Sequence, residues 1–150
     1  MNLLASKYLI NSPIEWLLDE SDPSISYLTR RDILKDERCI DLYPKIAEST
    51  EIGKLIGKTG AILGDSKNHD IYYSGTIWCF AEAVERGLDM RSPVIRDTAE
   101  FIISRCQTPS GGFSLKWKPQ AELACRTSDM VRLLLKAGFN DNTIRNGVRW

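Results

Sequence analysis

Apolar residues recur at steps of three and four positions in the second half of the chain. One series is Ile77, Phe80, Ala81, Val84 and Leu88, and another is Ile95, Ala99, Ile102, Ile103 and Cys106. This spacing places the apolar side chains on one face of a helix, so it predicts helices over 77–87 and 93–106. Gly87 lies where a helix end favours a left-handed residue, and Ser92 followed by Pro93 can begin the next helix. The short connection makes the two helices antiparallel neighbours.

The same pattern returns near the C-terminus. Its apolar series consists of Met130, Leu133, Leu134 and Ala137. The series ends at Gly138, and the polar residues 140–142 can cap a last helix that carries Ile144 and Val148.

The N-terminal part carries two helix-start signals. Ser12 precedes Pro13, and Asp22 precedes Pro23. A Ser or Asp side chain can cap free N–H groups, and proline suits the first helical turn. The two signals predict a helical hairpin.

The middle of the chain is less regular. Glycines interrupt residues 48–63, so only a short helix is expected there, and residues 64–75 are expected to form a loop. No strand pattern is present. The sequence therefore predicts one all-α domain over residues 1–150, with about six or seven helices.

The second half contains the same unit twice. Thr76, Gly87 and Leu88 recur 51 positions later as Thr127, Gly138 and Phe139, and Arg96 and Phe101 recur 49 positions later as Arg145 and Trp150. A period of about 50 residues with two helices indicates a helical-pair repeat, in which each pair buries its apolar face against its neighbours.

Charge and hydropathy narrow the classes of partner. Twenty Lys and Arg residues balance twenty Asp and Glu residues, without a basic run, which argues against nucleic acid as a partner. No apolar run approaches the roughly 20 residues that span a bilayer. The N-terminal MNLLASKYLI lacks the basic region and cleavage site of a secretory signal, so we expect a cytoplasmic protein.

The four cysteines do not form a metal-binding motif. Cys39, Cys79, Cys106 and Cys125 are far apart, and His69 is the single histidine. Structural zinc sites and disulfide-rich scaffolds use closely spaced ligands or denser cysteines. We expect these cysteines to be small buried residues.

Several motifs carry a family resemblance. The joint QTPSGGF, residues 107–113, follows the apolar helix end FIIS and resembles the Gln-to-aromatic repeat of squalene–hopene cyclases and protein prenyltransferase β subunits. The stretches DPSISYLTRRDIL, SGTIWCFAEAVERGLD and CRTSDMVRLLLKAGF resemble uncharacterised bacterial and archaeal proteins identified as prenyltransferase or squalene-cyclase repeat proteins. The resemblance covers roughly residues 13–150 and implies helical hairpins arranged as a partial α/α-toroid.

The resemblance also implies a role for the joint. Gln107 would hydrogen-bond around a helix end under the ring of Phe113, while Gly111 and Gly112 let the backbone turn, so that the joint clamps neighbouring helices. The chain departs from the family pattern at Phe113, where tryptophan is usual, and between residues 63 and 72, where the expected repeat joint is degenerate.

The catalytic motifs of the related enzymes are missing. The sequence has no D-x-D-D cluster for polyene protonation and no D-D-x-x-D for magnesium diphosphate. His69, Cys125 and Asp129 supply the residue types of a prenyltransferase zinc site without its spacing. Packing for Cys125, a helix cap or solvated position for Asp129 and a surface loop for His69 are the favoured interpretations.

A remaining hypothesis is that the protein binds an apolar small molecule in a pocket. The residues that could line its pocket are Trp78, Trp117, Met130 and Leu134, although aromatic residues at helical spacing are more often part of a core.

The repeat also leads to an expectation about partners. Trp150 aligns with Phe101, so the chain stops inside a repeat. We therefore expect a second copy in a homodimer, or an apolar molecule, to cover the inner face that carries Trp78, Met130 and Leu134. Cys125 is expected near the rim of this face. The alternatives are a metal-dependent or isoprenoid transferase whose active site is incomplete in this chain, and a protein-binding scaffold.

Overall fold

The computed structural model describes residues 13–19, 22–57, 75–114 and 121–150, and these are helical with no named strand. The α-helices are α2 (Pro13–Asp19), α3 (Pro23–Leu28), α4 (Tyr43–Glu48), α5 (Thr50–Gly57), α6 (Thr76–Glu85), α7 (Pro93–Cys106), α8 (Ala124–Lys136) and α9 (Asn142–Arg149). A π-helix, η1 (Thr29–Leu34), continues α3, and a 3₁₀-helix, η2 (Glu37–Leu42), leads into α4. The all-α class is confirmed for this part of the chain.

Helix starts follow the signals in the sequence. The Asp22 carboxylate accepts a 2.8 Å hydrogen bond from the Ser24 N–H at the start of α3. Asp141 accepts from the N–H groups of Thr143 and Ile144 at the start of α9. These side chains satisfy N–H groups that have no partner within the helix.

The described ranges contain more helices than expected. Eight α-helices are present instead of about six or seven, because the segment 35–48 holds η2 and α4, which the apolar pattern does not reveal. Helices this short gain stability from packing, and Ile46 of α4 is fully buried. The short helix expected within 48–63 is α5, whereas the expected loop, apart from Gly75, lies outside the described residues.

Two helix ends have the same geometry and confirm the predicted 51-residue offset. Gly87 after α6 has φ +103°, and Gly138 after α8 has φ +97°. The N–H of Leu88 bonds to the carbonyl of Ala83, and the N–H of Phe139 bonds to that of Leu134, each five residues back. This pairing, together with a bond three residues back from each glycine, is the Schellman motif.

A third left-handed helix end lies earlier in the chain. Lys35 has φ +53° and ends the continuous helix formed by α3 and η1, 52 positions before Gly87. The described part of the chain thus contains three helix pairs: a first pair of α3–η1 with η2–α4, a second of α6 with α7, and a third of α8 with α9. The first pair does not stand out in the sequence because lysine occupies the position where glycine is expected.

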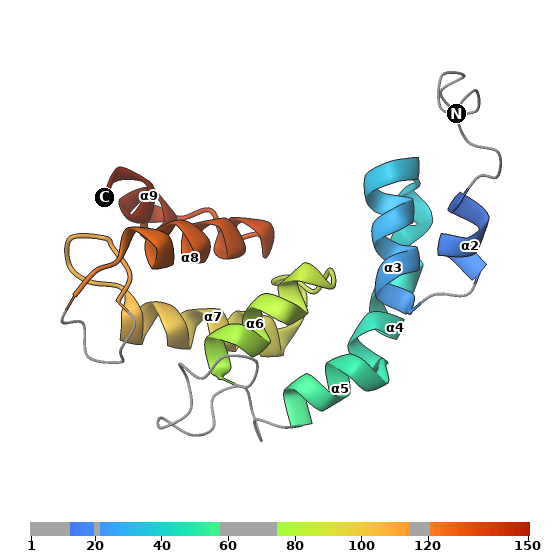
Figure 1. Ribbon diagram of the computed structural model, residues 1–150, viewed down its shortest axis with the longest axis horizontal. Helices are drawn as coiled ribbons and strands as arrows, with labels where there is room; N and C mark the ends of the chain where they lie inside the picture. Colours follow the sequence, from blue (N-terminus) through green and yellow to red (C-terminus); the bar gives the residue numbers. More distant parts are fainter. Residues whose placement is uncertain (1–12, 20–21, 58–74, 115–120) are drawn as a thin grey trace.

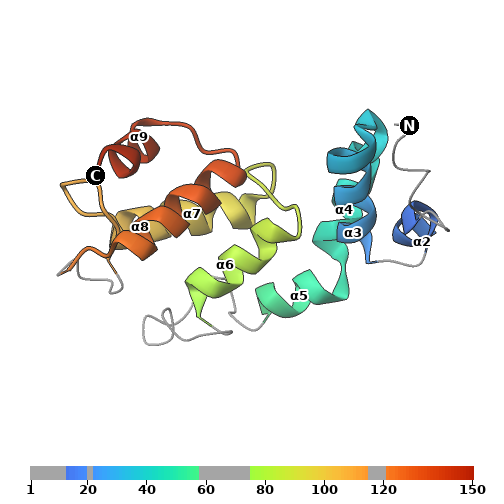
Figure 2. The same ribbon diagram turned by 45° about the horizontal axis from the view of Figure 1, so that its top comes forward.

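The three pairs follow one another across the molecule. Figures 1 and 2 show α2 to α4 on one side, α6 to α9 on the other, and α5 between them. Helix α5 contacts α6, α6 contacts both α7 and α8, and α8 contacts α9. One continuous apolar core extends through all three pairs.

Candidate functional site

The joint between α7 and α8 connects the second and third helix pairs. The Gln107 side-chain amide donates to the carbonyls of Gly111, at 3.0 Å, and Thr143, at 2.9 Å. Thr143 lies in the first turn of α9, so the hydrogen bond expected from Gln107 to a helix end is present. It joins residues 36 positions apart in the sequence.

The other joint residues lie close to the same helices. The ring of Phe113 is fully buried, and its backbone N–H donates to the Thr127 hydroxyl at 2.8 Å. A Cβ atom at Gly111 would lie 2.6 Å from the Asn146 carbonyl oxygen, and one at Gly112 would lie 2.7 Å from the Trp150 ring. Such close approaches require the absence of a side chain.

Glu122 adds polar contacts on the outside of this joint. Its carboxylate accepts hydrogen bonds from Thr108, Ser110 and the indole Nε1 of Trp150. These bonds lower the pKa of Glu122 below its ordinary value, and the bond from Ser110 has the largest effect. No sequence motif indicated this cluster, because its members come from separated segments.

The apolar residues expected to line a pocket are dispersed. Met130 and Leu134 have no exposed surface and belong to the core cluster. They lie on the side of α8 that packs against the chain's own helices. Trp78 on α6 is 39 % exposed, and Trp117 lies outside the described residues.

The proposed zinc ligands are not brought together in the described ranges, which contain no group of three His, Cys, Asp or Glu side chains suited to a metal ion. His69 lies outside those ranges. Asp129 on α8 pairs with Arg132 at 3.1 Å. Cys125 is exposed near the start of α8, because it projects away from the apolar side of that helix. The expectation that Cys125 is buried is therefore wrong.

The remaining cysteines follow the packing expectation in part. Cys79 and Cys106 are buried, and Cys39 is half-buried.

An exposed face runs across α6 and α8. The Glu85 carboxylate on α6 accepts hydrogen bonds from Arg132 and Lys136 on α8, which lowers its pKa, with Lys136 as the largest cause. At helical spacing around these three residues lie Trp78 and Glu82 on α6 and Asp129 and Leu135 on α8. We call this set of seven residues the α6–α8 face. Leu135 is 47 % exposed.

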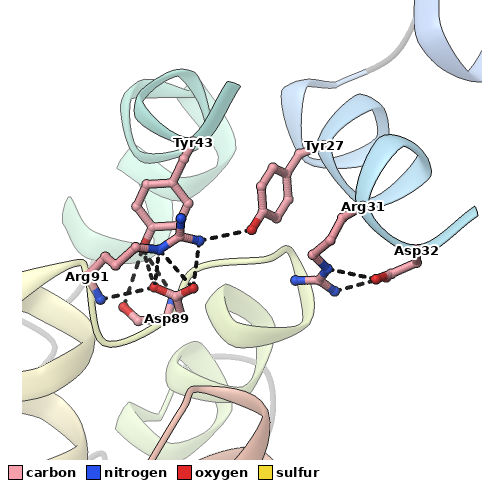
Figure 3. A network of polar contacts seen from close by, with 6 residues as sticks. All are labelled: Tyr27, Arg31, Asp32, Tyr43, Asp89 and Arg91. Atoms are coloured by element: carbon pink, nitrogen blue, oxygen red, sulfur yellow. Dashed lines mark hydrogen bonds and ion pairs between the residues drawn. The ribbon is translucent and has the colours of Figure 1, made fainter. Parts of the chain in front are cut away.

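A second polar network joins the first helix pair to the turn between α6 and α7 (Figure 3). The Arg91 guanidinium donates to the Tyr27 hydroxyl at 2.9 Å and to Asp89, and it lies 3.8 Å from the centre of the Tyr43 ring. The Tyr43 hydroxyl donates to the Asp89 carboxylate at 3.1 Å. The Tyr27 and Tyr43 rings meet edge to face.

The charges in this network affect one another. Burial raises the pKa of the Asp89 carboxyl, but hydrogen bonds from the Arg91 side chain and backbone outweigh burial and leave that pKa below its ordinary value. Burial is also the main reason why the pKa of Tyr43 lies above its usual range. Asp89 is therefore ionised and Tyr43 protonated at neutral pH.

Comparisons with known proteins identify no relative: no family model matches the chain, and neither the curated proteins nor the solved structures contain a match. Within the described ranges, the helices are too short or too polar to cross a membrane.

Proposed function

We propose that this chain is a helical-repeat module that binds another polypeptide chain and does not itself catalyse a reaction. The α6–α8 face is the observation that carries this proposal. It combines an exposed tryptophan and an exposed leucine with an arginine, two glutamates, an aspartate and a lysine. Tryptophan and arginine are enriched among the residues that dominate binding energy in protein interfaces.

The arrangement of this face favours a protein over an apolar small molecule. Small-molecule sites are concave and mostly apolar. On the α6–α8 face, by contrast, Glu85 with Arg132 and Lys136 forms a charged bridge between the two helices. The residues that could have lined an apolar hollow, Met130 and Leu134, fill the core instead.

The proposal also includes the architecture that the resemblance to prenyltransferase and squalene-cyclase repeats implies. The hydrogen bonds of Gln107 and the close approach of Gly111 to α9 support a joint of that type. We propose that the three helix pairs form a toroid-like array, in which the joints hold successive pairs in register. The array serves as a scaffold in this proposal.

A photo-crosslinking residue in place of Leu135 tests the binding proposal. The variant is expressed in the cells from which the sequence comes, irradiated and analysed by mass spectrometry. We expect an adduct between α8 and a peptide, either from a second copy of this chain or from another protein. Trp78→Ala in the same background should lower the yield of this adduct several-fold, because an aromatic contact on the same face is lost.

The matched control carries the crosslinker in place of Ser104, which is exposed on α7. It should give no comparable adduct. A lipid-sized adduct at Leu135, or equal protein adducts at both positions, would overturn the assignment of the α6–α8 face.

A further inference from the structure

The Tyr27 hydroxyl lacks an acceptor for its proton among the described residues. Tyr27 is 3 % exposed, and its hydroxyl oxygen accepts a 2.9 Å hydrogen bond from a guanidinium nitrogen of Arg91. A guanidinium group is a donor only, so this bond uses a lone pair of the oxygen and leaves the hydroxyl proton without a partner. Burying a polar group without its hydrogen bond costs free energy, so a hydroxyl in this position calls for an acceptor.

Arg31 brings a second guanidinium group to this hydroxyl. The group lies 5.3 Å from the centre of the Tyr27 ring, and its Nε and one Nη donate to the Asp32 carboxylate at 2.7 and 2.9 Å. The other Nη has no acceptor among the described residues, and Figure 3 shows it pointing away from Asp32, on the side of the Tyr27 hydroxyl. The pKa of Arg31 is raised chiefly by Asp32 and to a smaller extent by Tyr27, so Arg31 and the hydroxyl interact.

The two guanidinium groups flank the hydroxyl at a position that solvent reaches. In Figure 3 Arg91 lies on one side of the Tyr27 hydroxyl and Arg31 on the other. The Arg31 side chain is 35 % exposed and that of Arg91 41 % exposed. A position with hydrogen-bond donors, two positive charges and no described acceptor suits an anionic oxygen, which forms the stronger, charge-assisted kind of bond with arginine.

The two carboxylates of the network orient the arginines and leave this position open. Asp32 accepts from Arg31, and Asp89 accepts from Arg91, but neither accepts the Tyr27 proton. The pKa of Asp32 lies below its ordinary value chiefly because of Arg31, with a smaller contribution from Lys136 on α8. A further positive charge is therefore within electrostatic reach of the same position.

The chain contains an internal comparison without a tyrosine. The Arg38 backbone N–H and guanidinium bond to Asp36, two positions earlier, just as those of Arg91 bond to Asp89. Arg30 also pairs with Asp36, at 3.1 Å. Two arginines thus meet one carboxylate there, and no described tyrosine hydroxyl bonds to either of them.

We propose that the Tyr27 hydroxyl and the guanidinium groups of Arg31 and Arg91 form a binding site for one oxyanion group, a carboxylate or a phosphate. An oxygen of the anion accepts the Tyr27 proton and a hydrogen bond from Arg31, while Arg91 stays on Asp89 and adds its positive charge. The site lies where the first helix pair meets the turn between α6 and α7. It does not depend on the proposed function.

Nitrogen-15 NMR of the full chain tests this site. The protein is titrated with sodium phosphate and, separately, with sodium acetate, with sodium chloride keeping the ionic strength constant. We expect saturable shifts of the Arg31 and Arg91 Nε–H signals with at least one of the two anions, whereas the signals of Arg30 and Arg38 in the same sample should not saturate. A response to phosphate alone assigns the site to phosphate groups, and a response to acetate alone assigns it to carboxylates.

Two variants separate the site from general charge attraction. Tyr27→Phe keeps the ring and removes only the hydroxyl, so it should weaken the apparent affinity several-fold. Arg31→Gln removes a partly exposed guanidinium group, so it tests the site without changing a core residue, and it should abolish saturation. The control Arg38→Gln should leave the affinity unchanged.

Three results would overturn the site. They are the absence of saturation with both anions in the natural chain, equal shifts at Arg31 and Arg38, and an unchanged affinity in Arg31→Gln or Tyr27→Phe. In each case water, and not an anion, would be the acceptor of the Tyr27 proton. The titration needs no partner chain, so its failure is distinguishable from failure of the binding proposal.

Discussion

Gln107 shows how one side chain can connect two repeats. Its amide donates to carbonyls of the joint and of α9, and the residue is partly buried. Water cannot replace both bonds without opening the joint. The motif around Gln107 predicted this bond to a helix end, but it did not predict that the acceptor would be Thr143, which lies beyond α8.

Replacing Gln107 by alanine should lower the free energy of unfolding by about 1 to 2 kcal/mol, because the carbonyls of Gly111 and Thr143 lose a partner. Urea denaturation followed by circular dichroism measures this change. Ser104→Ala on the exposed side of α7 is the control and should change the value by less than about 0.5 kcal/mol. Equal effects of the two substitutions would contradict the role of Gln107.

Asp89 should make the contact between the first helix pair and the turn between α6 and α7 sensitive to acid. Its pKa is lowered in the folded chain, so the ionised carboxylate stabilises the fold above the unfolded pKa of about 4, and this contribution is lost as the pH falls below that value. The difference in unfolding free energy between the natural protein and Asp89→Asn should therefore be present at neutral pH and shrink below about pH 4. A difference that stays constant across this range would argue against the pairing with Arg91.

At the scale of elements, the left-handed helix ends define the repeat. Gly87 and Gly138 share one hydrogen-bond pattern but have different neighbours. A Cβ atom at Gly138 would meet only the side chain of Met90, at 3.8 Å, whereas one at Gly87 would meet the Tyr27 ring at 2.8 Å.

Because the two glycines differ chiefly in this contact with Tyr27, alanine substitutions at both positions can be compared directly. Gly138→Ala should cost roughly 1 to 2 kcal/mol of stability, the price of a left-handed alanine. Gly87→Ala should cost about 1 to 3 kcal/mol more, because the added methyl group also displaces Tyr27. Denaturant midpoints of the two variants measure the comparison, and equal losses would show that Tyr27 does not pack on this turn.

Sequence periodicity predicted elements unevenly. Helix α7 spans residues 93–106 as expected, because a proline start and a long apolar series agree there. Helix α4 was missed, because six residues carry too little pattern and tertiary packing around Ile46 decides their conformation. The network around Arg91 could not be foreseen either, since Tyr27 lies 64 positions away and no motif links the two.

At the scale of the whole molecule, the sequence indicated apolar faces but not what covers them. The series containing Met130 and Leu134 correctly predicted α8, yet both side chains are covered by the chain's own helices. The expectation of a homodimer or a bound apolar molecule rested partly on Met130 and Leu134. Trp78 and Leu135 are exposed beside the charged residues of the α6–α8 face, and this mixed surface fits a protein partner better than an apolar molecule.

Native mass spectrometry of the protein purified from its own cells without denaturant tests the proposed function most directly. The chain has a mass of 17.0 kDa. The account predicts that all retained mass beyond one chain belongs to polypeptide, either further copies of this chain or another protein, and that Trp78→Ala reduces it. A lipid-sized molecule that stays bound to the single chain, and is unaffected by Trp78→Ala, would contradict it.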